Sequence, residues 1–287
     1  MYLIFFIPLC YYLIFQYWPM YGITIAFKNY NIVKGITGSE WVGLEHFRKF
    51  LIDPYFWKLV RNTLVINVYE ILFGFPMPII LALLLNEIRH PLFKRFVQSV
   101  SYLPHFISTV VVAGMIVNFL STDGLVNQIV EWLGGSPIQF LMKPEWFRTI
   151  FVSSGIWQSV GWGSIIYLAA LTSIDLELYE AARIDGAGRW KQMLNVTLPG
   201  MAPTISIMLI LNLGNLMRLG FEKIILLYNG STYETADVIS TYVYRRGLLG
   251  SDFSYATAVE VFQAIVGLVL LVLANRASRK ISETSLW

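Results

Sequence analysis

Six long apolar blocks dominate this 287-residue sequence and constrain its fold more than any other feature. A helix needs about 20 apolar residues to cross the hydrocarbon layer of a bilayer. The blocks are continuous, whereas the strands of a membrane barrel would alternate in polarity. We therefore expect an all-α, polytopic membrane protein with about six transmembrane helices, at Leu3–Phe27, Thr63–Leu85, Phe96–Leu120, Trp146–Thr172, Met201–Leu227 and Tyr255–Ala274.

The composition agrees with lipid as the main surrounding solvent. The chain is 56% hydrophobic and only 14% charged, whereas about a quarter of a soluble domain is charged. The net charge is +3 and the basic residues form no cluster suited to nucleic acid, so no nucleic-acid partner is expected. No repeat relates the first three blocks to the last three, which predicts a single membrane domain over residues 1–287.

The distribution of Lys and Arg predicts the orientation of the chain. An even number of spans places both termini on one side of the membrane. Basic residues are dense in the short second connector and after the last span, which indicates the cytoplasmic side. The long first connector also carries six basic residues while facing outward, so density near the span ends, and not the total, favours this orientation.

The second block contains a break, at Gly74–Pro78, where two prolines lie within five residues. A proline inside a helix removes a hydrogen bond and bends the helix. In a membrane such a bend is tolerated where neighbouring helices or a cavity satisfy the freed carbonyls. The break predicts a kink, serving either helix packing or a pathway through the protein.

The fourth connector contains a motif with fixed spacing. Glu180-Ala181-Ala182 is followed after three residues by Gly186, and Val196-Thr197-Leu198-Pro199 begins nine residues later. Leu178–Ile184 can form one or two helical turns, and Gly186 can supply a turn that needs positive φ. A second short helix can begin at Arg189. Without further information, the alternative is an ordinary amphipathic helix at the membrane surface.

This segment resembles the signature E-A-A-x3-G-x9-I-x-L-P of binding-protein-dependent ABC permeases, and departs from it only in Val196 for Ile. The resemblance implies that residues 173–199 form a cytoplasmic coupling-helix loop. In the family this loop lies in a cleft of the ATPase and transmits its closure to the channel. The residues implied in coupling are Glu180, Ala181, Ala182, Asp185 and Gly186.

Three further stretches look like permeases for carbohydrate uptake, in particular those for complex oligosaccharides in Gram-positive bacteria. They are Pro19–Gly22, Asn62–Leu64 and Tyr102–Pro104. The resemblance implies a multi-pass subunit in a bacterial plasma membrane with both termini cytoplasmic. It also implies several partners besides the lipid bilayer: a second permease, expected to be a paralogue, two cytoplasmic ATPase subunits, an extracellular solute-binding protein and an oligosaccharide.

The resemblance also predicts where the solute passes, because family permeases bind it mainly through the spans flanking the motif. The offset from Glu180 indicates Gln158, Trp162, Asn212 and Asn215. Amides can bond sugar hydroxyls and an indole can stack on a pyranose. The alternative role for these side chains is to join helices.

Arg218 lies in the fifth predicted span, where an arginine should face a cavity or a counter-ion. It pairs either with a glutamate (Glu70, Glu222 or Glu260) or with an acidic solute such as a uronate-bearing oligosaccharide.

No enzymatic activity, catalytic residue or metal site is expected in this chain. It has no G-x-x-x-x-G-K-[ST] phosphate loop, so ATP and Mg belong to a separate ATPase and no cofactor is expected here. H-E-x-x-H and G-x-S-x-G are absent as well. Two alternatives remain: an ion-coupled secondary transporter, in which Glu70 and Glu260 would bind protons, and an ABC permease for a solute other than a sugar.

Overall fold

The structure is a computed structural model that describes residues 2–282, with side chains described for residues 5–279. The chain divides into two compact units. The first contains the chain up to Arg61 together with Val238–Val266, and the second contains Asn62–Asp237 together with the chain from Gly267 onward. Two helices, α5 and α17, contribute to both units. The expected single domain over residues 1–287 stays a prediction.

The first predicted span, Leu3–Phe27, is helical throughout, although its helix type changes three times. Its side chains are mostly exposed within the chain, with Trp18 at 78%. An apolar segment with so little protein around it requires lipid or a partner protein. Its elements are α1 (Tyr2–Tyr12), the π-helix η1 (Leu13–Tyr17), α2 (Trp18–Met20) and the 3₁₀-helix η2 (Tyr21–Phe27).

The remainder of the first unit consists of short elements around an aromatic core. Phe50 forms the centre, with its ring centroid 5.0 Å from that of Phe56 and 5.5 Å from that of Phe262. Strands β1 (Lys28–Asn29) and β2 (Glu40–Trp41) pair antiparallel, with Lys28 opposite Trp41. The helices are α3 (Gly35–Gly38), α4 (Glu45–Leu51), α16 (Ile239–Val243), the π-helix η7 (Tyr244–Leu249) and the unit's parts of α5 (Phe56–Tyr69) and α17 (Phe253–Ser282).

Besides the first span, three more of the predicted spans are confirmed as continuous helical segments. They are α5 with the π-helix η3 (Glu70–Gly74) and α6 (Pro76–Glu87), α10 (Pro144–Thr172), and α17. The π turn lies just before Pro76, so the break predicted at Gly74–Pro78 is present as a local change of helix type. By length and composition the described residues contain four helices able to cross a membrane, or five if the pair α10 and α11, bent by 71°, counts as one.

The prediction of an unbroken third span at Phe96–Leu120 was wrong. The segment divides into α7 (Pro91–Tyr102), the 3₁₀-helix η4 (Leu103–Phe106) and α8 (Thr109–Leu120). Ile107 is extended at ψ 131°, and Ser108 then caps α8 by accepting a hydrogen bond from the backbone N–H of Val111. Pro104 and this serine cap terminate one helix and start another within the predicted span.

The prediction of an unbroken fifth span at Met201–Leu227 was also wrong. α13 (Leu198–Gly214) ends at Gly214, and α14 (Phe221–Leu227) begins only after Gly220. The end of α13 packs closely against α17, because a Cβ at Gly214 would overlap Leu271. Asn215 and Arg218 therefore lie in a non-helical connection and do not share a helical face.

The second unit is built around α10, which packs against α6, α7, α13 and α15 (Tyr233–Ala236). Two glycines allow this close packing: a Cβ at Gly161 would overlap the carbonyl of Ser101, and one at Gly163 would lie 3.1 Å from Pro78. Also in this unit are α9 (Leu125–Trp132), the 3₁₀-helix η5 (Phe140–Met142), α11 (Leu176–Ile184), α12 (Arg189–Gln192) and the π-helix η6 (Met193–Thr197).

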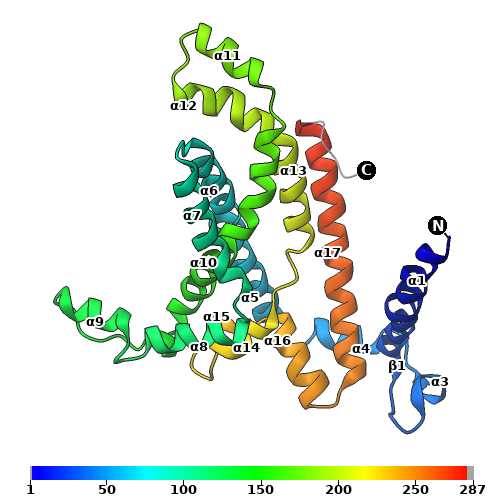
Figure 1. Cartoon of the computed structure of the whole chain (residues 1–287). Coiled ribbons are helices and arrows are strands. Elements are labelled where there is room, and N and C mark those ends of the chain that lie inside the picture. The colour runs from blue at the N-terminus through cyan, green and yellow to red at the C-terminus, as the bar shows by residue number, and fades with distance from the viewer. Residues whose placement is uncertain (1, 283–287) are drawn as a thin grey trace. The chain divides into compact units, whose positions relative to one another are not determined.

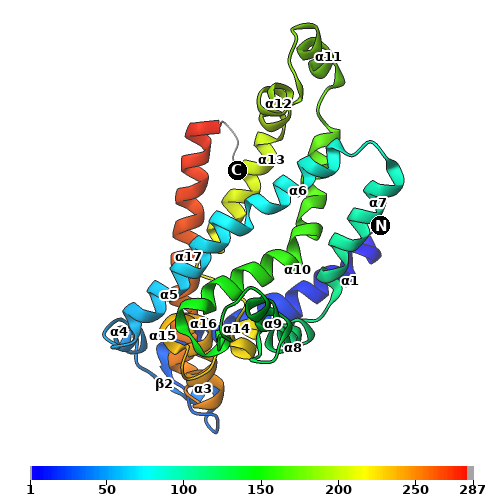
Figure 2. The ribbon, with the colours of Figure 1, turned by 90° about the vertical axis from the view of Figure 1, so that its left-hand side faces the viewer.

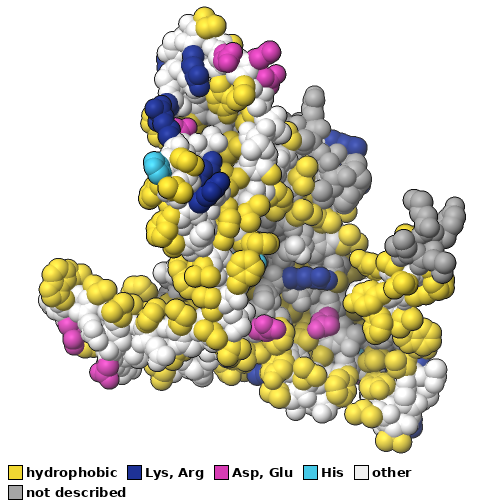
Figure 3. Space-filling model, in the orientation of Figure 1, with side chains coloured by type: hydrophobic (Ala, Val, Ile, Leu, Met, Phe, Trp, Pro, Cys, Tyr) yellow, Lys and Arg dark blue, Asp and Glu magenta, His cyan; other side chains and the backbone are white. Residues whose placement is uncertain are grey.

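Helices α11 and α12 lie beyond the ends of α10 and α13 (Figures 1 and 2). They form a hairpin that extends from one end of the second unit. Charged side chains of both signs gather over this hairpin, whereas the helices next to it in the same view are mainly covered by hydrophobic side chains (Figure 3). This end of the unit is therefore suited to water or a polar partner, and the adjoining helices to lipid.

Candidate functional site

The coupling segment predicted at residues 173–199 forms a helix–turn–helix. Asp175 caps α11, its carboxylate accepting a hydrogen bond from the backbone N–H of Glu177 at 2.9 Å. Gly186 ends the helix with φ +75°. The backbone N–H groups of Gly186 and Ala187 bond the carbonyls of Arg183 and Ala182, at 3.0 and 2.9 Å. This is a Schellman ending, so the expected positive φ is confirmed.

The hairpin is attached to the membrane helices by a small set of contacts. The hydroxyl of Tyr179 lies 3.0 Å from Oγ1 of Thr197, which joins α11 to η6. Tyr179 and Val196 pack against a buried cluster that includes Tyr167 and Met201. α12 is attached to α6 by an ion pair between side chains at the two helix ends. A displacement of the hairpin would thus act on both α6 and α13.

The predicted coupling residues are accessible to a partner. Glu180, Ala181, Asp185 and Gly186 are exposed, and Ala182 is half-buried. Large apolar side chains of the same hairpin are exposed as well, with Ile184 at 86% and Trp190 at 73%. Exposed apolar side chains mixed with charges are typical of a protein-binding surface.

Two adjoining cavities follow one face of α10. The larger, of about 710 Å³, lies towards the N-terminal end of α10, with Glu145, Arg148 and Thr149 in its wall. The smaller, of about 300 Å³, lies nearer the middle and is lined by Ser159 and Gly163 among others. Both include Val152 and Ile156 in their walls, so they adjoin, and we refer to the two together as the groove. The α10 residues of this groove recur every three or four positions, as one face of a helix requires.

Trp162 and Asn212, two residues predicted to contact the solute, line the smaller cavity. The indole of Trp162 is half-exposed and stacks on the ring of His105, with centroids 4.6 Å apart and planes within 2°. Asn212 donates its amide to the carbonyl of Met208 at 2.8 Å, which leaves its side-chain oxygen as an acceptor. The arrangement provides a flat aromatic surface beside polar groups.

The other three predicted residues do not line these cavities. Gln158 donates its amide to the carbonyl of Ile107 at 3.1 Å, so it satisfies a backbone acceptor at the break between η4 and α8. Asn215 and Arg218 are exposed on the connection after α13. Within the part of the chain that the structure describes, Arg218 makes no ion pair of 4.0 Å or less. Contact of these residues with a solute stays a prediction.

Glu70 and Gly155 line the smaller cavity, and sequence reasoning did not propose either as a solute contact. Lys223 was not among the predicted residues either, and its Nζ lies 3.5 Å from a Cβ built on Gly155. Glu70 could have been found from the sequence, because an acidic residue within an apolar block indicates a functional position. No sequence signal could show that residues 70, 155 and 223 meet at one point, because they lie on three different helices.

The family of the chain follows from a comparison with known proteins. A family model described as "Binding-protein-dependent transport system inner membrane component" matches residues 74–283, which include most of the groove and the predicted coupling segment. The chain belongs to this family. The resemblance inferred from the E-A-A-x3-G segment is therefore confirmed, as are the all-α membrane fold and the class of transport permease.

This permease has similar relatives along its whole length. A Bacillus subtilis (strain 168) protein, named polygalacturonan/rhamnogalacturonan transport system permease protein YteP, is 48% identical over 98% of this chain and 88% of its own. Protein LplB of the same organism is 43% identical over 100% of this chain and 91% of its own. A chain from the "crystal structure of bacterial alginate ABC transporter in complex with alginate pentasaccharide-bound periplasmic protein" matches with a TM-score of 0.91 and 46% identity, covering 99% of this chain and 96% of that one.

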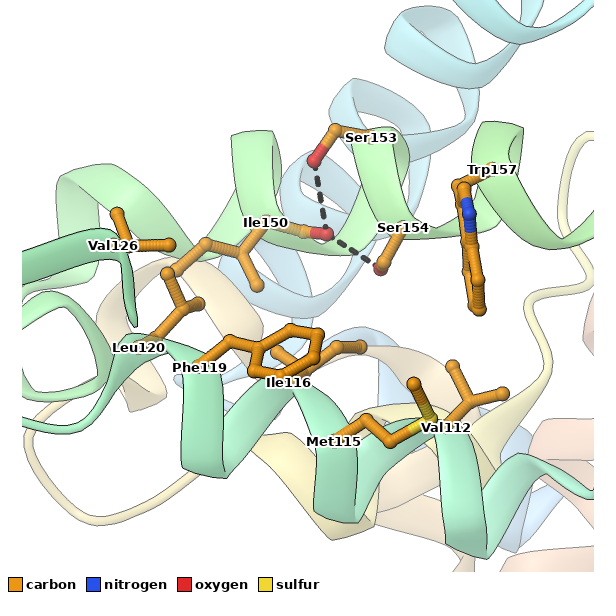
Figure 4. A pocket seen from close by; sticks show the side chains of 10 residues that line it. All are labelled: Val112, Met115, Ile116, Phe119, Leu120, Val126, Ile150, Ser153, Ser154 and Trp157. Carbon is orange, nitrogen blue, oxygen red and sulfur yellow. Dashed lines mark hydrogen bonds between the residues drawn. The ribbon is translucent and has the colours of Figure 1, made fainter. Parts of the chain in front are cut away.

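The permease contains another pocket, of about 350 Å³, between α8 and α10, and its walls are mainly apolar (Figure 4). Its two serines, Ser153 and Ser154, both donate to the carbonyl of Ile150, at 3.3 and 2.6 Å. Their hydroxyl protons are thus used within α10, and the pocket suits an apolar occupant rather than a sugar. Among the described residues no three His, Cys, Asp or Glu side chains gather as a metal site would require.

Proposed function

We propose that this chain is a channel-forming subunit of an ATP-driven importer of acidic, uronate-bearing oligosaccharides. The observation that carries the proposal is its similarity, over nearly its whole length, to proteins named for the transport of polygalacturonan/rhamnogalacturonan and of alginate. Alginate is called an acidic polysaccharide in a second structure that matches with the same TM-score of 0.91, and polygalacturonan is by its name a polymer of galacturonate.

The chemistry of the groove supports a sugar as solute. Trp162 offers an aromatic face on which a pyranose can stack, and Asn212 and Ser159 offer groups that can bond its hydroxyls. Arg148 and Glu145 both line the larger cavity, so one cation and one anion lie in its wall and the acidity of the solute is inferred from the named relatives alone. A cavity of several hundred Å³ with few polar groups is usual for small-ligand sites.

The exposed hairpin supports coupling to ATP hydrolysis on a separate chain. Glu180, Ala181, Ala182, Asp185 and Gly186 form the surface that docks to an ATPase subunit, and ATP and Mg belong to that subunit. A second permease, expected to be a paralogue, and a solute-binding protein outside the cell complete the importer. The hairpin and both chain termini then face the cytoplasm of a bacterium, expected to be Gram-positive. The two terminal segments, residue 1 and residues 283–287, lie outside the described residues.

Reconstitution tests this function directly. The chain is purified with its second permease, the ATPases and the binding protein, placed in liposomes, and supplied with galacturonate oligosaccharides or neutral oligosaccharides of equal length. ATP-dependent uptake of the acidic oligosaccharides, well above that of the neutral ones, is expected. Uptake driven by an ion gradient without ATP would favour the secondary-transporter alternative. Equal uptake of acidic and neutral oligosaccharides would overturn the assignment of the solute.

A further inference from the structure

Two opposite charges lie close to Gly155, in the middle of α10. A Cβ built on Gly155 would lie 3.5 Å from Nζ of Lys223 and 3.9 Å from Oε1 of Glu70. Lys223 comes from α14 and Glu70 from the π turn η3, so three separate segments bring these groups together. Both residues are described, and the structure shows no ion pair of 4.0 Å or less between them. Both charges therefore border the space that a side chain on residue 155 would fill.

The ammonium of Lys223 contacts Phe151 in two ways. Its side chain is only 9% exposed, and its ammonium donates to the carbonyl of Phe151 at 3.0 Å. The same ammonium lies 4.8 Å from the centre of the Phe151 ring. These contacts satisfy part of a buried cation, and the negative charge of Glu70 adds a further favourable interaction.

Glu70 is the member of the pair that faces the groove. It lines the smaller cavity together with Gly155, Ser159, Trp162 and Asn212. Among the contacts of the described residues, its carboxylate accepts no hydrogen bond. A carboxylate offers about four acceptor positions, and Glu70 lines the cavity, where a ligand can reach them. Its position suits a ligand with hydrogen-bond donors.

We propose that Glu70 binds the solute, its carboxylate accepting hydrogen bonds from neighbouring sugar hydroxyls while Trp162 stacks on the ring. Two adjacent hydroxyls match the two oxygens of a carboxylate, and hydrogen bonds to an ionised acceptor are strong. Lys223 is a positioning residue that keeps this carboxylate charged and directed into the cavity. This inference rests on the proposed function, since it names a solute-contact residue for the same groove.

A charge-removal cycle in the complete importer tests the inference. Glu70→Gln alone leaves Lys223 uncompensated and can lower assembly, so the deciding variant is Glu70→Gln with Lys223→Met, which removes both charges. For that double variant we expect wild-type yield of the complex but ATP-dependent uptake reduced by about tenfold or more. If Glu70 serves only as a counter-ion for Lys223, the double variant will transport at the wild-type rate, which would overturn the proposal.

Two conservative variants and a matched control complete the experiment. Lys223→Arg keeps the charge behind Glu70 and should retain most of the uptake, whereas Lys223→Met should lose it while Glu70 is present. Equal uptake by these two variants would contradict the positioning role. Glu222→Gln makes the same chemical change as Glu70→Gln on an exposed residue next to Lys223, and its uptake should stay within about twofold of wild type.

Failure of this inference is distinguishable from failure of the proposed function. If wild-type importer carries neutral and acidic oligosaccharides equally, the assignment of an acidic solute is wrong. In that case a tenfold loss in the double variant, with both kinds of oligosaccharide, still supports Glu70 as a hydroxyl-binding residue. If instead only acidic oligosaccharides are carried and the double variant carries them normally, the acidic solute stands and the role of Glu70 is wrong.

Discussion

Arg189 of α12 and Glu87 at the end of α6 form an ion pair, with 3.3 Å between Nη1 and Oε2. This pair joins the coupling hairpin to the span that contains the π turn at Glu70. Both side chains are more than half exposed, at 63% and 56%, so the pair contributes at most about 1 kcal/mol to stability. We propose that the pair transmits movement between the hairpin and α6.

Reversal of one charge in this pair should weaken coupling, and reversal of both should restore it. For Glu87→Arg we expect ATP-driven uptake to fall about three-fold, because like charges now repel at this contact by up to ~1 kcal/mol. Adding Arg189→Glu should recover most of the uptake. The measurement is solute transported per ATP hydrolysed, at low and at high salt, since salt screens exposed charges. A double variant no better than the single one would argue against transmission through this pair.

Glu180 is the residue expected to contact the ATPase. Glu180→Lys reverses the charge at the centre of a small, exposed docking surface, so the affinity for the ATPase subunits should fall at least about tenfold. The permease itself should still insert and remain folded, because Glu180 is exposed. Copurification with the ATPase subunits measures the effect. An intact complex with normal transport would show that Glu180 is not part of the docking surface.

Gly186 is required for its backbone conformation and not for space. Its φ is +75°, and no atom lies within 4 Å of a Cβ placed on it. Strain should therefore order the variants: Gly186→Asn mildest, Gly186→Ala intermediate at ~1 kcal/mol, and Gly186→Val most severe. ATP-driven uptake should decrease in the same order. If Ala and Val behave alike, steric strain at this turn does not control coupling.

A substitution of Arg218 tests whether the solute is charged. It is exposed and makes no ion pair within the described residues, so Arg218→Gln should leave the yield of the complex unchanged. If an acidic solute compensates this cation, uptake of acidic oligosaccharides should fall about tenfold, as losing ~1.5 kcal/mol of charged hydrogen bonding implies. Matched neutral oligosaccharides should be affected much less. Poor yield with equal loss for both solutes would assign Arg218 a structural role.

Asp53 should make the first unit sensitive to acid. Burial by itself would raise its pKa, but hydrogen bonds from Tyr242, the Tyr55 backbone and Tyr255 outweigh burial and hold the pKa below the usual range. The hydroxyls of Tyr242 and Tyr255 lie 2.6 and 3.1 Å from its Oδ2. A carboxyl with a lowered pKa stabilises the fold above its unfolded pKa of about 3.9, and this contribution is lost as the pH falls through the folded value.

The difference in melting temperature between wild type and Asp53→Asn measures this contribution. It should be constant at neutral pH and should decrease as the pH falls below about 4, where wild type loses the charge that the variant lacks. Glu45→Gln provides a comparison, since that carboxylate is exposed and paired with Lys49 on the same helix. A difference between wild type and Asp53→Asn that does not change with pH would show that Asp53 acts through its shape alone.

Much of the candidate site was accessible to prediction because it depends on local features. The E-A-A-x3-G spacing located the coupling hairpin, and Gly186 adopts positive φ for reasons confined to a few residues. Trp162 and Asn212, predicted from their offsets from Glu180, both line the smaller cavity, while their contact with a solute stays a prediction. By contrast, Gln158 satisfies the carbonyl of Ile107, a partner that only the break in the third span creates.

The apolar blocks and the motif by themselves determined a helical membrane permease, because hydropathy and fixed spacing are properties of the chain alone. What packs against the breaks in those blocks was decided by tertiary structure. α13 ends at Gly214, where it packs against Leu271 of α17, and Gln158 of α10 reaches Ile107 at the break in the third span. In both cases the partner lies on another helix, so local signals such as Pro104 and the Ser108 cap could not reveal it. The meeting of Glu70 and Lys223 at Gly155 has the same origin, since the separation of two charges on different helices depends on how those helices pack.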